Sequence, residues 1–233
     1  MSTTLGVLLG VTADAPASWA LRDDEAGALI DAGGAARARD LTGLPEADKT
    51  VLIAPGTDVL TRCVETPAKS ESQFRAAAPF LLEDHVATSM DGQHLAIGPA
   101  PAASGAARVV AAVSRAKMDE WRELLDELGL RASRIVADYA AFACRPGEAN
   151  VADLGDRLAV AICDGEGVRT GFAIEATLGS HTVPNMLHEA GVRVVILQGG
   201  DEALAAACRA AGLEVRHAAP LGARAQLEAA LEE

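Results

Sequence analysis

The sequence predicts a mixed α/β fold built from more than one lobe. Short apolar runs bounded by turn residues indicate strands, and stretches with hydrophobic residues at helical spacing indicate helices between them. In the last third, three short strands are followed by alternating helix and strand, which is typical of a mixed sheet covered by helices. A chain of 233 residues can bury a substantial core, in one large domain or in two or three small lobes.

The N-terminal third is predicted to form strands joined by loops. Residues 5–11 and 51–54 are short apolar runs next to turn residues, and residues 19–21 extend the same meander. Residues 31–40 are rich in Gly, Ala and Arg, which favours a loop or a weak helix. A further strand begins at Val59 and leads to a corner at Pro67.

Two helices are predicted in the middle third. Ser70 and Gln73 have the spacing of a capping box, and Pro79 should kink or split the helix that they begin. Between them and the second helix, residues 93–98 and 108–114 indicate two strands. The second helix spans residues 114–129, with one apolar face, and Gly129 is placed to end it.

The last third alternates strands and helices. Residues 150–154, 158–163 and 168–174 indicate three strands, residues 183–190 a helix, and residues 193–197 a fourth strand. Gly199, Gly200 and Asp201 then open an alanine-rich helix that ends near Gly212. The boundary with the earlier lobes is expected at residues 145–148.

Composition disfavours nucleic acid as a partner, and the cysteines and apolar runs indicate the cellular compartment. A net charge of −13 and only 3% aromatic residues disfavour nucleic acid, because phosphates are repelled and few rings can stack on bases. The four cysteines are far apart, which indicates reduced thiols in a cytoplasmic protein. No signal peptide or apolar run of membrane-spanning length is expected. The cysteines are Cys63, Cys144, Cys163 and Cys208.

Catalytic and metal motifs are missing, so no enzyme activity, catalytic residue or metal is expected. There is no phosphate loop with GxxxxGK, no GxGxxG, no GxSxG and no HExxH. His181 and His188 can share a helix face, but zinc needs further ligands. Asp153 and Asp156 are interpreted as turn carboxylates that bond the local backbone rather than as a catalytic pair.

Three turns carry a first resemblance. A strand enters a turn at Gly10, a hairpin begins with Asp153 and Gly155, and a strand enters the turn of Gly199 and Gly200. In this order they resemble the two phosphate loops and the adenosine loop of the actin and hexokinase superfamily. That resemblance implies RNase H-like lobes, with these five residues at the former nucleotide pocket.

The same turns have lost the groups that hold a nucleotide. Leu8 stands where ATP-binding members carry an aspartate, and Asp156, Arg157 and Leu158 stand where they have small residues and a hydroxyl. A further carboxylate repels a triphosphate, and bulky side chains restrict the approach of backbone amides. No cofactor is therefore expected.

A second resemblance covers most of the chain and is most specific over residues 55–138. Its motifs are a strand corner, a helix core with proline, and a His-x-Ala-x-Gly-Pro run, here TPA at 66–68, AAPFLLED at 77–84 and HLAIGP at 94–99. Together they resemble the L component of the bacterial type II secretion system. This resemblance implies a first RNase H-like lobe at 1–65 completed by about 134–148, an inserted SHS2-like sheet-and-helix lobe at 66–133, and a second RNase H-like lobe at 149–233.

The family resemblance also implies a function. It implies a scaffold on the cytoplasmic side of the inner membrane that recruits the secretion ATPase (the E component) through the N-terminal domain of that enzyme. The M component and other platform proteins are implied partners through parts absent from this chain, and a homodimer is implied. Glu83, Asp84 and Asp91 are the hypothesised partner-binding residues, although they are equally consistent with a solvated face. The alternative is a nucleotide-binding, actin-like assembly protein related to PilM or FtsA.

Overall fold

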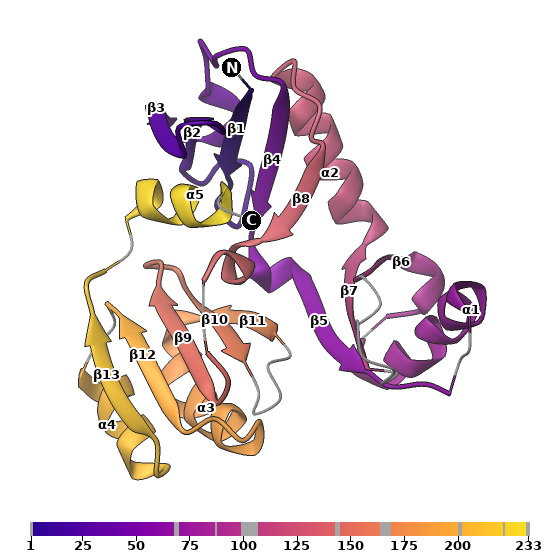
Figure 1. Ribbon diagram of the computed structural model, residues 1–233, viewed down its shortest axis with the longest axis vertical. Helices are drawn as coiled ribbons and strands as arrows, with labels where there is room; N and C mark the ends of the chain where they lie inside the picture. The colour runs from indigo at the N-terminus through magenta and orange to yellow at the C-terminus, as the bar shows by residue number, and fades with distance from the viewer. Residues whose placement is uncertain are drawn as a thin grey trace.

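A computed structural model describes the chain over residues 2–67, 70–86, 88–98, 107–142, 145–163, 169–199, 202–220 and 222–231. Its strands form three sheets, and each sheet is the centre of one lobe (Figure 1). Two of the lobes lie one above the other in the figure, and the smallest lobe stands to one side. The predicted mixed α/β class is confirmed.

The first lobe contains a five-stranded sheet in the order β3-β2-β1-β4-β8. The strands are β1 (Thr3–Leu8), β2 (Ala17–Asp23), β3 (Ala28–Ala35), β4 (Lys49–Ala54) and β8 (Arg134–Ala137). The first three form an antiparallel meander, and β4 and β8 extend it in parallel with β1. Alternate residues of β4 face opposite ways. Leu52 packs toward α2 (Arg115–Glu127), and Ile53 packs toward α5 (Ala223–Leu231).

The second lobe repeats this arrangement with the strand order β11-β10-β9-β12-β13. Its strands are β9 (Glu148–Asp153), β10 (Arg157–Cys163), β11 (Arg169–Glu175), β12 (Val194–Gln198) and β13 (Glu214–Ala218). Again three antiparallel strands are followed by two parallel ones. The core packs the sheet against α3 (Ala176–Glu189) and α4 (Glu202–Ala210), with Leu187 and Leu204 buried. The chain therefore contains two lobes of the same topology.

The small lobe is an antiparallel sheet in the order β5-β7-β6, covered on one face by α1 (Glu71–Leu82). The strands are β5 (Val59–Val64), β6 (Gln93–Ile97) and β7 (Arg108–Ser114). Phe74, Ala78 and Leu82 of the helix pack on Val64 and Val110 of the sheet. The other face of the sheet points toward the body of the molecule.

The observed lobe limits differ from those expected from the sequence. β5 lies in the expected first lobe but pairs with β7 in the small sheet. Conversely, α2 lies within the expected insert but buries Trp121 and Leu125 against the first sheet. α5 lies within the expected second lobe but also packs on the first sheet. An apolar stripe shows that a helix covers a sheet, but it does not show which sheet.

Two local expectations also changed. Residues 31–40 were expected as a loop or weak helix, yet β3 extends to Ala35 as an edge strand paired with β2. Trp19 of β2 covers β3, since a Cβ on Gly33 would lie 2.8 Å from the indole nitrogen. Pro79 does not split α1, which continues to Leu82.

The predicted cap at Ser70 and the predicted stop at Gly129 are confirmed, whereas α3 begins at Ala176 rather than near residue 183. The Ser70 hydroxyl accepts from the backbone of Gln73 at 3.3 Å, and the Ser114 hydroxyl caps α2 in the same way at 3.2 Å. Gly129 follows α2 with φ of +69°, a left-handed conformation that suits glycine.

Candidate functional site

The three turns predicted from the sequence meet at the junction of the two large lobes. Leu9 and Gly10 follow β1, the hairpin from Asp153 to Arg157 joins β9 to β10, and Gly199 follows β12. A Cβ built on Gly199 would lie 3.5 Å from Cβ of Asp153, so the second and third turns touch. Nη2 of Arg157 lies 3.4 Å from the carbonyl oxygen of Leu9, so the second turn reaches the first. Gly200 lies outside the described residues.

Each predicted turn residue has a local structural role. Oδ1 of Asp153 accepts from the backbone of Gly155 at 2.8 Å, the local bond expected for an aspartate in a turn. Gly155 has φ of +91° and Gly199 has φ of +78°, conformations that residues with a Cβ rarely adopt. A Cβ on Gly10 would lie 2.9 Å from the carbonyl oxygen of Pro16, so the turn is closely packed there.

A buried ion pair occupies the junction. Nε of Arg157 donates to Oδ2 of Asp138 at 2.8 Å, and the two side chains are 6% and 1% exposed. Nη1 of Arg157 donates to Asp156 at 2.8 Å, so its nitrogens contact three different acceptors. Asp138 also accepts from the backbone of Tyr139 at 2.7 Å and from the backbone of Gly56. Burial raises the pKa of the Asp138 carboxyl, and these donors oppose the rise.

Tyr139 joins the lobes on the other side of this pair. Its ring lies between Gly56 of the first lobe and Gly171 of β11. A Cβ added to Gly56 would lie 2.5 Å from Cδ1 of the ring, and one added to Gly171 would lie against Cδ2 and 2.9 Å from Cε2. Its hydroxyl donates to the carbonyl of Val59 at 3.2 Å and bonds Thr61 of β5. Burial raises the pKa of this phenol, which keeps it protonated.

A second, weaker pair lies beside the first turn. Nζ of Lys117 at the start of α2 is 3.9 Å from Oδ2 of Asp58 and 2.7 Å from Glu120. Burial raises the pKa of the Asp58 carboxyl, and the cation of Lys117 opposes the rise. The hydrogen bond from Glu120 raises the pKa of Lys117. At the junction, Lys117 and Arg157 are thus each paired with carboxylates.

An apolar cavity of about 350 Å³ lies between the free face of the small sheet and the body. Val109, Ala111 and Val113 of β7 form one wall, and Ile135 of β8 and Met118 of α2 lie opposite. Its polar lining groups are few: Thr61, His94, Tyr139 and Thr170. The cavity can accept apolar groups.

The hypothesised partner-binding residues lie on the small lobe. Glu83 and Asp84 form the turn after α1, Asp91 lies in the turn before β6, and all three side chains are exposed. Phe80 is 77% exposed on the outer face of α1. Glu83 and Asp84 follow it in a short 3₁₀ turn beyond the end of α1. An exposed aromatic side chain can serve as an anchor where a partner offers a pocket for it.

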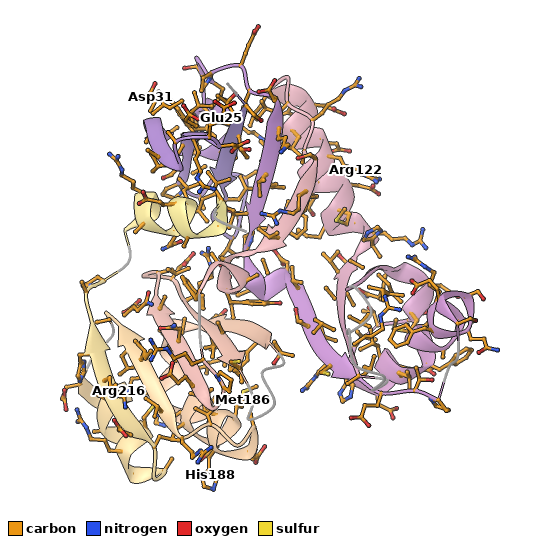
Figure 2. The ribbon with its side chains drawn as sticks, in the orientation of Figure 1. Glu25, Asp31, Arg122, Met186, His188 and Arg216 are labelled. Atoms are coloured by element: carbon orange, nitrogen blue, oxygen red, sulfur yellow. The ribbon has the colours of Figure 1, made fainter. Side chains whose placement is uncertain are left out.

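The described part of the chain contains neither a group of metal ligands nor a helix that could span a membrane. It contains no group of three His, Cys, Asp or Glu side chains placed to hold a metal. His181 and His188 are both exposed on α3 (Figure 2 labels His188). Among the helices described, none has the length and apolar character needed to cross a bilayer. Cys163 and Cys208 are buried free thiols and Cys63 is exposed, while Cys144 lies outside the described ranges.

Comparison with known proteins decides the family. Residues 5–193 match the family described as type II secretion system protein L. The chain belongs to this family. Two curated relatives bear the same name: the protein L of Dickeya chrysanthemi is 31% identical over 90 residues, and that of Pectobacterium carotovorum subsp. carotovorum is 29% identical over 98 residues. These alignments cover 39% and 42% of this chain, but only 22% of each relative.

Solved structures confirm the fold. The cytoplasmic domain of EpsL, an inner-membrane component of the type II secretion system of Vibrio cholerae, superposes with a TM-score of 0.76 at 20% identity, over 100% of this chain and 96% of that one. The PilM–PilN type IV pilus biogenesis complex gives a TM-score of 0.64 at 12% identity, over 98% of both chains. A Bacteroides thetaiotaomicron protein with an actin-like ATPase fold gives 0.62 at 10%, over 100% and 96%. The expected actin-like fold of this protein L family member is therefore confirmed.

Sequence reasoning missed the acidic half of the buried pair. Arg157 was noted in the second turn, but Asp138 was named only as the end of the segment that most resembles the family, and Tyr139 was not singled out. One signal was available: Asp138 interrupts the apolar run from Ile135 to Phe142, and a buried carboxylate needs a partner. The sequence could not name Arg157 as that partner, because the two residues lie in different lobes of this protein L.

Proposed function

We propose that this protein L domain is a scaffold that recruits the secretion ATPase, the E component, by binding the N-terminal domain of that enzyme on the cytoplasmic side of the inner membrane. Family membership supports a role in type II secretion. The outer face of α1 supports docking, because Phe80 is exposed there on a lobe that stands away from the body (Figure 1), and the exposed Glu83 and Asp84 follow it in the chain. This outward face is the observation that carries the proposal.

The scaffold performs no chemistry in this proposal. At the lobe junction, the charged groups of Arg157 and Asp138 neutralise each other in a buried pair. A catalytic acid or base must lie within hydrogen-bond reach of the substrate proton that it transfers. The energy of secretion then comes from the recruited ATPase. The M component, other platform proteins and a second copy of the chain are further partners in this proposal.

Charge and an apolar anchor have separate roles in the docking. An aromatic side chain that enters a pocket on the partner supplies most of the affinity. Carboxylates at the rim mainly raise the association rate with a basic surface, and salt weakens this effect. Phe80 is therefore expected to control the dissociation rate, and Glu83, Asp84 and Asp91 the association rate.

Surface plasmon resonance with the immobilised N-terminal domain of the ATPase tests the proposal. Reversal of Glu83, Asp84 and Asp91 to Lys should lower the association rate about tenfold and flatten its salt dependence. Phe80→Ala should raise the dissociation rate about tenfold. The matched control reverses three exposed acids of the first lobe, Asp31, Glu123 and Asp126, and should change neither rate by more than about twofold. Equal effects in both triple variants would refute the assignment of this face.

A second candidate function is that of a nucleotide-binding assembly protein related to PilM or FtsA. The meeting of the three turns at the lobe junction favours it, since a nucleotide would bind there. It predicts heat on titration of Mg-ATP in calorimetry, lost in Asp153→Ala. A flat titration with the unchanged protein would eliminate this candidate.

A further inference from the structure

The ion pair of Arg157 and Asp138 connects the two large lobes inside the protein. Arg157 begins β10 of the second lobe, and Asp138 begins the turn that follows β8 of the first lobe. Both side chains are almost completely buried. A buried charge is costly unless a partner and hydrogen bonds compensate it. The pair therefore forms only when the lobes are in the orientation seen here.

Each side of the pair is tied to several segments. The guanidinium contacts Asp138 and the carbonyl of Leu9, both in the first lobe, through different nitrogens. The carboxylate accepts from Arg157 of the second lobe and from the backbone of Gly56 and Tyr139 in the first. Because the guanidinium is planar and its donors have fixed directions, these contacts define an angle as well as a distance.

Apolar packing surrounds the pair at the junction. The Tyr139 ring fills the space between Gly56 and Gly171, which belong to different lobes. Alanines 137, 152, 159 and 161 complete a small-residue core across the junction. At the far end of the chain, α5 returns from the second lobe to the first sheet, where Arg134 donates to the carbonyl of Ala230 at 3.1 Å.

A charged pair at this place specifies an orientation that apolar packing alone would not. Apolar contacts between small residues are non-directional and tolerate sliding. A buried pair is satisfied in one geometry and loses several hydrogen bonds when the lobes rotate. Fixed orientation is a different property from stability, since a buried pair often adds little net stability compared with apolar residues.

We propose that Arg157 is an interlobe lock: by bonding Asp138 and the Leu9 carbonyl from the opposite lobe, it holds the two actin-like lobes in one orientation. The lock gives the small lobe and the rest of the molecule a fixed geometry. It is independent of which partner the domain recruits.

Hydrogen–deuterium exchange of the purified domain tests the lock. In Arg157→Met, amides of the junction at residues 9–10, 56–58, 138–142 and 154–158 should exchange about tenfold faster, while amides of β4 and β12 keep their rates. Arg216→Met is the matched control, because Arg216 lies in the same sheet and pairs with Glu214 and Glu148, but its own side chain is 53% exposed. It should leave the junction unchanged.

A double variant distinguishes the loss of fixed lobe orientation from the cost of an unpaired buried charge. It also provides a test if Arg157→Met folds poorly. Arg157→Met with Asp138→Leu leaves no unpaired buried charge, since Asp156, the other carboxylate that contacts Arg157, is half exposed. Its melting temperature should therefore return close to that of the unchanged protein. The junction should nevertheless still exchange about tenfold faster, because no directional bond remains. Normal junction protection in the double variant would overturn the proposal, as would a uniform rise over all amides in the single variant.

Discussion

Gly171→Ala should force the lobes apart, and the structure gives the size of the effect. The new methyl group would lie 2.5 Å from the carbonyl oxygen of Val160 and against the Tyr139 ring. Real Cβ atoms do not approach backbone so closely, so something must move. The ring cannot turn away, because its opposite side meets Gly56 and its hydroxyl is held by Val59.

The expected cost is about 3 kcal/mol, the upper end of the range for overpacked cores, because one obstacle is backbone. For a chain of this size, 1 kcal/mol corresponds to roughly 2–4 °C. The melting temperature in calorimetry should therefore fall by about 6–12 °C. Gly92→Ala is the matched control, since nothing lies within 4 Å of its added Cβ, and it should shift the melting temperature by less than about 2 °C.

A double-mutant cycle shows whether the ring is the obstacle. Tyr139→Ala alone should cost about 3–5 kcal/mol through the cavity that it leaves. In combination with Gly171→Ala, the methyl group partly fills that cavity, so the double variant should be at least about 1 kcal/mol more stable than the sum of the two changes predicts. Additive costs in urea unfolding would refute the packing of Tyr139 against Gly171.

Three further changes have local effects. Glu71→Gln tests a pH dependence: the hydrogen bond from Arg108 lowers the pKa of Glu71, so its stabilisation is present above pH 4.5 and is lost as the pH falls through the lowered pKa. Unfolding of the unchanged protein against pH should show this loss, and the variant should lack it. Ser114→Ala should cost about 1 kcal/mol by removing the cap on the Lys117 amide, measured in urea, and Ser114→Asp should restore most of it. Leu52→Ala, at a fully buried position, should cost about 2–5 kcal/mol by the same assay, and a cost below 1 kcal/mol would contradict its place in the core.

Helix ends were predictable because their causes are local. Ser70 and Ser114 cap amides three residues away, and Gly129 ends α2 with its own backbone. These interactions need no distant partner, so neighbouring residues alone specify them. The apolar stripe of α2 was equally clear.

Edge strands and lobe limits were less predictable. β3 contains glycine and alanine, which have little preference for strands, and it forms because β2 offers a partner and Trp19 covers Gly33. Along the chain, β5 and α2 each lie at a border between the first lobe and the small lobe, so either lobe could include them. The sheet that each one joins is decided by pairing and packing with distant segments.

The sequence by itself determined the class of fold, the family and the three turns. Hydrophobic periodicity, helix caps and motif spacing depend only on residues that are close together in the chain. Only the tertiary structure showed that Arg157 meets Asp138 across the two lobes, with Tyr139 held between Gly56 and Gly171. The physical reason is distance along the chain. A buried charge requires a partner, but any of several opposite charges in the sequence could supply it, and folding alone selects one.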